Sequence, residues 1–82
     1  MQKSIFSVFD SKASVFATPF TSTNTATATR DFSRACNDPQ SDLSAFPEDY
    51  FLYQIATFDD QTGLISPVQI INLGNASQFK EK

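Results

Sequence analysis

Hydrophobic and polar residues alternate in three segments of the chain, and this period of two predicts β-strands. Residues 3–10 carry apolar side chains at both odd and even positions, so we expect a central strand with both faces in use. Residues 50–58 give the strongest signal, and Phe51 and Tyr53 fall on one face of that strand. Residues 64–73 predict the returning strand of a hairpin. A proline within this last segment has no N–H to donate, which indicates an edge or a bulge.

A helical period replaces the alternation in the middle of the chain. The apolar residues that recur there at positions i, i+4, i+7 and i+8 are Ala28, Phe32, Ala35 and Cys36. Thr25 or Thr27 is suited to cap the start of this helix, and the Asn-Asp-Pro sequence at 37–39 ends it. Arg30 and Arg34 are four residues apart and therefore share a side of the helix, where they form a candidate anion-binding stripe.

The remaining segments are expected to be loops within one domain that spans residues 1–82. Residues 13–20 predict a loop or an irregular strand, and residues 21–27, rich in Thr and Ser, predict a flexible loop. Residues 39–49 contain two prolines and predict another loop, while residues 75–82 form a short polar tail. The fold class that follows is α+β in the order β-loop-α-β-β, with a small antiparallel sheet of about three to four strands and one main α-helix.

The composition is rich in phenylalanine and poor in catalytic residue types. The 82 residues include nine Phe, two Tyr and one Cys, but no His and no Trp. Without His, the usual zinc ligand sets are missing, and so is the base that would activate Cys36. The adjacent acids Glu48 and Asp49, and likewise Asp59 and Asp60, fall in predicted turns. Turn formation and solubility are the ordinary roles of acidic residues there. We therefore expect a protein that is not an enzyme and that uses no metal and no cofactor.

Stacking and hydrogen bonding are the chemistry that this composition retains. Proteins bind single-stranded DNA with rings on which bases stack and with cations that follow the backbone. The candidate residues are Arg30, Arg34, Lys12 and Lys3 for phosphates and Phe51 and Tyr53 for bases. Judged by residue type alone, rings on a strand are more often core residues than stacking residues. The rings that we assign to the core are Phe9, Phe32, Phe58 and Phe79.

A series of short phrases spread over nearly the whole chain resembles one family. The phrases are SVFDSKA at 7–13, TPF at 18–20, AxRxF at 28–32, NDP at 37–39, FPEDY at 46–50, IxxFDxxTG at 55–63 and LGxAxxFK at 73–80. In this order and spacing they resemble the small nonstructural protein of gokushovirus-type microviruses, which are tailless phages with small circular single-stranded DNA genomes. The crowding of Thr and Ser at 21–27 departs from that pattern.

The resemblance implies a non-virion protein of the host bacterial cytoplasm that binds single-stranded DNA. It implies further that the protein assists the switch from duplex replication to the synthesis and packaging of single-stranded genomes. The sequence holds no apolar run of the roughly 20 residues that a membrane span needs, so we expect no membrane association.

The excess of acidic over basic residues argues against a large positive electrostatic field that would attract DNA. Six basic residues stand against nine acidic ones, for a net charge of −3, whereas affinity for DNA arises mainly from Lys and Arg. Symmetric assembly into a homo-oligomer would bring Lys12, Arg30 and Arg34 of two subunits into one channel. The alternative is a protein-interaction module that docks on the phage replication initiator, the procapsid or a host replication factor.

Overall fold

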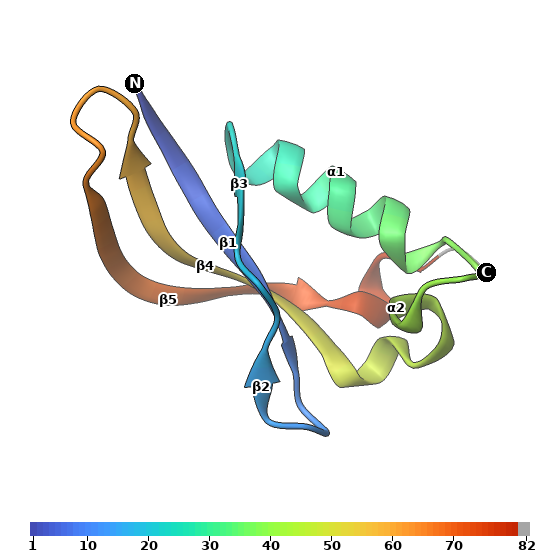
Figure 1. Cartoon of the computed structure of the whole chain (residues 1–82). Helices are drawn as coiled ribbons and strands as arrows, with labels where there is room; N and C mark the ends of the chain where they lie inside the picture. The colour runs from blue at the N-terminus through green and yellow to red at the C-terminus, as the bar shows by residue number, and fades with distance from the viewer. Residues whose placement is uncertain (81–82) are drawn as a thin grey trace.

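Strands and helices make up most of the computed structural model, which describes residues 1–80 (Figure 1). The longer elements are β1 (Gln2–Asp10), α1 (Thr25–Cys36), β4 (Tyr50–Asp59) and β5 (Ile65–Asn75). The shorter ones are β2 (Val15–Phe16), β3 (Phe20–Ser22), α2 (Asp42–Ala45) and the 3-10 turns η1 (Pro47–Asp49) and η2 (Ala76–Gln78). No helix within this part of the chain is long and apolar enough to cross a membrane.

The strands of residues 1–80 form one antiparallel sheet in the order β2-β1-β4-β5, in which β3 also pairs with β1. β1 pairs with β4 along its whole length, from Gln2 opposite Asp59 to Asp10 opposite Tyr50. Because β4 occupies one edge of β1, the short strands β2 and β3 share the other edge. The sheet thus ends in two short strands on one side and in the long strand β5 on the other.

Bulges interrupt the register of the sheet and bend it. The pairing of β1 with β4 shifts between Ile5 and Phe6, and the pairing of β4 with β5 shifts twice. A bulge leaves extra residues unpaired on one strand and increases the local twist, and Figure 1 shows β4 and β5 curving together. Pro67 lies opposite Ala56 next to one of these shifts. Because proline has no N–H to donate, the sequence predicts an edge or a bulge for this residue, and Pro67 lies in an edge strand beside a bulge.

The core lies between α1 and one face of the sheet. Phe6 of β1 and Leu52 of β4 are fully buried against Ala28, Phe32 and Cys36 of α1. The helix therefore covers the sheet with the face that the spacing of its apolar residues predicts. A second group packs around this cluster, consisting of Val8, Phe20, Leu43, Tyr50, Leu73 and Phe79.

The end of β5 bends back so that the last part of the chain joins the core. Gly74 has a φ of 143°, a conformation that residues with a Cβ rarely adopt, so glycine suits this bend. The bend places the Phe79 ring edge-on to Phe32 with their centroids 5.7 Å apart. The side chain of Asn37 donates a hydrogen bond of 3.0 Å to the backbone oxygen of Phe79 and ties this segment to the end of α1.

The α+β class, the antiparallel sheet and the main helix agree with the prediction, whereas the number of elements is larger. The sheet has five strands rather than three to four, because β2 and β3 arise in segments that the sequence marks as irregular. Residues 21–27, expected to be a flexible loop, hold the end of β3 and the start of α1. Asn24 caps the helix by accepting a hydrogen bond of 2.8 Å from the Thr27 N–H. Of the predicted tail, residues 75–80 include η2, and the final two lie outside the described residues.

Phe32 tests the packing of α1 on the sheet. The Phe32→Ala substitution should lower the free energy of unfolding by about 3 to 5 kcal/mol, because this ring is 3% exposed and its loss leaves a cavity. Chemical denaturation monitored by circular dichroism measures the change. Phe46→Ala is the matched control, since Phe46 is 60% exposed and its loss should change stability by less than about 0.5 kcal/mol. Equal effects of the two substitutions would contradict this description of the core.

Candidate nucleic-acid interface

Three strands bring aromatic rings together on one side of the sheet. Phe9 of β1 and Phe16 of β2 are direct cross-strand partners, with ring centroids 4.8 Å apart. Tyr53 of β4 lies edge-on to both, at 5.6 Å from Phe16 and 6.1 Å from Phe9. These separations lie in the range in which aromatic pairs attract each other. The ring contacts therefore hold the side chains in place without enclosing them.

This cluster lies on the face of the sheet that α1 does not cover. Leu52 is buried beneath α1, and its neighbours Phe51 and Tyr53 point to the opposite face because side chains alternate along a strand. Phe51 is the cross-strand partner of Phe9, so it belongs to the same surface. We call the four residues Phe9, Phe16, Phe51 and Tyr53 the aromatic face. Phe16 is 46% exposed, and the other three are half-buried.

A short hairpin positions Phe16 on this face. The Asp10 carboxylate accepts hydrogen bonds from the backbone N–H groups of Lys12 and Ala13, at 3.0 and 3.2 Å. Ser14 follows with a φ of 58°, a left-handed conformation that turns the chain back along β1. The turn leaves Lys12 exposed at the tip of the hairpin. One cation therefore lies just beyond one end of the aromatic face.

Lys3 lies beyond the other end. It is an exposed residue of β1, six positions before Phe9, and an even separation along a strand places both side chains on the same face. The distance between them along β1 is about 20 Å at roughly 3.3 Å per residue. Lys3 and Lys12 thus lie near the two ends of β1, with the rings beside Lys12 and the buried residues Ile5 and Ser7 between Lys3 and the rings.

Arg30 and Arg34 lie elsewhere. They are exposed on α1, on the side of the helix that faces away from its buried residues Ala28, Phe32 and Cys36. The sheet stands between these arginines and the aromatic face. The structure therefore does not bring Arg30 and Arg34 beside Phe51 and Tyr53 within one subunit, because those two rings occupy the uncovered face.

Phe9 and Phe16 are members of this surface that the sequence did not assign to it. Phe9 was expected in the core, but the core side of β1 is formed by Phe6 and Val8. The alternation of β1 contains this information, since it places Phe9 opposite Phe6 and Val8. Nothing in the sequence alone shows which of the two faces the helix covers, and the position of Phe16 depends on a hairpin that was not predicted.

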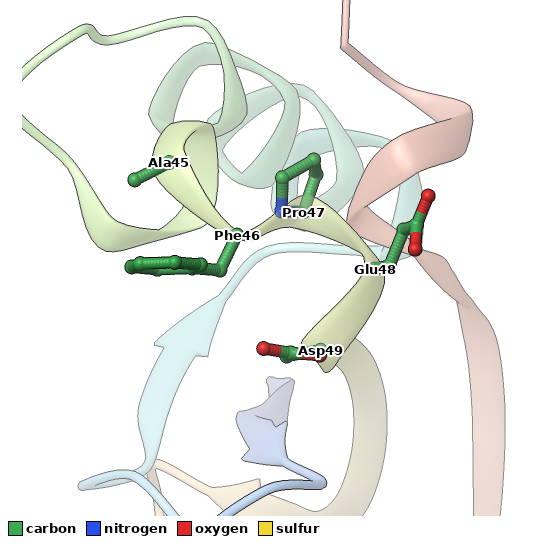
Figure 2. A pocket seen from close by; sticks show the side chains of 5 residues that line it. All are labelled: Ala45, Phe46, Pro47, Glu48 and Asp49. Atoms are coloured by element: carbon green, nitrogen blue, oxygen red, sulfur yellow. The ribbon is translucent and has the colours of Figure 1, made fainter.

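The end of the sheet at which β1 ends and β4 begins is acidic. An open pocket of about 270 Å³ is lined by the residues from Ala45 to Asp49, and Figure 2 shows Phe46 and Asp49 extending to one side of the turn while Glu48 extends to the other. Burial raises the pKa of the Tyr50 hydroxyl, and the carboxylates of Asp10, Asp42 and Asp49 raise it further. These carboxylates lie beside the hairpin that carries Lys12, because the backbone N–H of Ser11 donates a hydrogen bond of 2.9 Å to the backbone oxygen of Asp49, and they oppose the approach of phosphate at this end of the sheet.

The single cysteine takes no part in either surface. Cys36 is buried in the core, and this burial raises the pKa of its thiol. A backbone hydrogen bond and the charge of Lys80 act in the opposite direction without reversing the shift. The thiol is therefore neutral and inaccessible, as expected for a packing residue.

Comparison with known proteins identifies one family. A family model described as Phage ORF5 protein matches residues 3–79. No curated protein and no solved structure matches the chain.

Proposed function

Since the chain belongs to the Phage ORF5 protein family and is therefore a bacteriophage protein, we propose that it binds single-stranded DNA through the aromatic face, without catalysis. The observation that supports this proposal is a cluster of rings on a sheet face that α1 leaves uncovered. Bases stack on exposed aromatic side chains whatever their sequence, and sheet surfaces are common platforms for such stacking.

Each residue of this surface has a separate role in the proposal. Phe16 is the most exposed ring and offers its face to a base, with Phe51 and Tyr53 as further stacking residues. Phe9 supports Phe16 from beside it. Lys3 and Lys12 bind phosphates near the two ends of β1. Two such contacts correspond to a salt slope of about −1.4, at roughly 0.7 per phosphate on a single strand.

Arg30 and Arg34 form a second phosphate-binding surface in this proposal. Neither guanidinium makes an ion pair with a carboxylate in residues 1–80, so both are available to an anion. A DNA strand that stacks on the aromatic face reaches these arginines only by passing around the subunit or by contacting a neighbouring copy. Assembly into a homo-oligomer, in which cations of two subunits contact one DNA strand, compensates for the net charge of −3.

The biological role that we propose follows the resemblance to gokushovirus-type microviruses. The protein acts in the host bacterial cytoplasm, outside the virion, where it covers newly made single strands. It thereby assists the switch from duplex replication to single-stranded genome synthesis and packaging. Binding of single strands in preference to duplex is the property that this role requires.

The acidic region favours a second function, docking on a phage replication protein, a capsid protein or a host replication factor. Phe46 is exposed beside the carboxylates of Glu48 and Asp49 (Figure 2). An apolar ring with acidic neighbours suits a basic and apolar segment of a partner. Pull-down from infected cells after complete nuclease digestion separates the two functions: partners that persist with the wild-type protein and are lost with Phe46→Ala support docking.

Removal of a stacking ring tests the proposed DNA interface. Phe16→Ala should weaken binding of a labelled single-stranded oligonucleotide about 5- to 150-fold, the equivalent of roughly 1 to 3 kcal/mol per stacked base. Fluorescence anisotropy at low salt measures the change, with Phe46→Ala as a control that removes an exposed ring from the acidic region. Absence of single-strand binding, or equal affinity for duplex, would contradict the proposed function.

Removal of the two arginines tests the second surface separately. Arg30→Ala together with Arg34→Ala should weaken binding and make the salt slope shallower by about 1.4, with no loss of melting temperature because both side chains are exposed. The same oligonucleotide titrated at several salt concentrations gives the slope. An unchanged slope would remove the arginines from the interface, and a lower melting temperature would assign them a structural role.

A further inference from the structure

The outer edge of β5 is a long run of unpaired backbone. β5 has eleven residues and, within residues 1–80, pairs through one edge only, with β4. The opposite edge of the sheet is formed by β2 and β3, of two and three residues. In Figure 1, β5 runs along the outer margin of the sheet. A long free edge is a template for a further strand, and proteins commonly avoid this by keeping edge strands short or charged. β5 is neither.

Exposed apolar side chains are concentrated at the same edge. Four of the large apolar residues with the greatest exposure lie in or just before β5, namely Leu64, Ile65, Ile70 and Ile71. Each is about half exposed or more. Leu64 and Ile65 lie before Pro67, whereas Ile70 and Ile71 lie after it and point to opposite faces of the strand. Exposed apolar side chains on both faces of an edge strand are typical of a contact with another macromolecule.

The distribution of charge identifies that macromolecule. Residues 61–79 contain no Asp, Glu, Lys or Arg, although the chain as a whole has a net charge of −3. Nucleic acid would require cations at this edge, and a strongly charged protein partner would require countercharges. Two copies of the chain repel each other over most of their surfaces, because like charges oppose close approach. They can meet without this cost at a neutral apolar edge.

We propose that β5 pairs in antiparallel fashion with β5 of a second copy, so that two sheets join into one. Pro67 and the adjoining bulge disfavour pairing in the first part of the strand, so the contact is centred in residues 68–73. This inference rests on the homo-oligomer of the proposed function and names its interface. A short strand pair with a few isoleucines is at the small end of stable interfaces, and the dimer should dissociate in the micromolar range.

The symmetry of this pairing restricts the register and fixes the side of the joined sheet on which the aromatic faces lie. Antiparallel strands are related by a two-fold axis perpendicular to the sheet, so each residue keeps its face in both copies. Opposed residues in a sheet share a face, and neighbours in a strand do not. If the axis passed between two neighbouring residues, side chains of opposite faces would lie opposite each other. One residue must therefore lie opposite the same residue of the second copy. For the same reason, both aromatic faces lie on one side of the joined sheet and both α1 helices on the other, so this dimer combines the lysines of two subunits beside the rings and leaves Arg30 and Arg34 on the opposite side.

Sedimentation velocity over a range of concentrations tests the dimer in the absence of DNA. The wild-type protein should shift from monomer to dimer, and Ile70→Lys should raise the dissociation constant at least tenfold, because a charge on an edge strand opposes pairing. Gln61→Lys adds the same charge in the exposed turn before β5 and should leave dimerisation unchanged. A wild-type monomer at millimolar concentration, or equal effects of the two lysines, would overturn the proposal.

Cysteine cross-linking locates the axis and does not depend on one variant. The six substitutions that place a cysteine at one position between residues 68 and 73 are oxidised separately, with the buried Cys36 left in place; they are Val68→Cys, Gln69→Cys, Ile70→Cys, Ile71→Cys, Asn72→Cys and Leu73→Cys. One position, opposite its own copy, should give a disulfide-linked dimer much faster than Gln61→Cys. A dimer that forms without a cross-link at residues 68–73 would place the interface elsewhere. Binding of DNA by the monomer, measured below the dissociation constant, is a separate result, so loss of the dimer and loss of DNA binding are distinguishable.

Discussion

The packing of one twelve-residue helix against one face of a sheet determines the rest of this structure. Phe32 and Cys36 of α1 close over Phe6 and Leu52, and this contact supplies most of the buried core that so short a chain can form. A single helix covers only one face. The opposite face, with Phe9, Phe16, Phe51 and Tyr53, is left to solvent or to a ligand. The functional proposal is a consequence of that asymmetry.

Charge sets the second constraint. The carboxylates near Tyr50 make one end of the molecule acidic, and Asp60 forms an ion pair of 2.7 Å with the N-terminal ammonium group at the far end of the sheet. That pair lowers the pKa of Asp60 and neutralises one acid close to Lys3. A protein with this charge balance cannot hold DNA by its electrostatic field alone, so the proposed function requires stacking for much of the affinity and assembly to multiply the few cations.

The sequence predicts the long elements because their patterns are regular. The helical spacing of Ala28, Phe32 and Cys36 marks α1 and its buried side correctly, and Pro67 indicates the irregular edge strand in which it lies. The short strands β2 and β3 have no such pattern, since they exist only through pairing with β1. The location of the arginines relative to the rings could not be predicted for a related reason. Alternation divides a strand into two faces but does not say which face receives the helix.

The central claim is that bases stack on the uncovered face of the sheet, and the ring protons of the aromatic side chains report this directly. Proton–carbon NMR spectra of protein labelled at Phe and Tyr, recorded during titration with oligothymidine, separate the rings by position. The account predicts upfield shifts for Phe16, Phe51 and Tyr53, because a base stacked on a ring shields its protons, and unchanged signals for the buried rings of Phe6 and Phe32. Unchanged signals from the aromatic face, with shifts confined to α1, would contradict it.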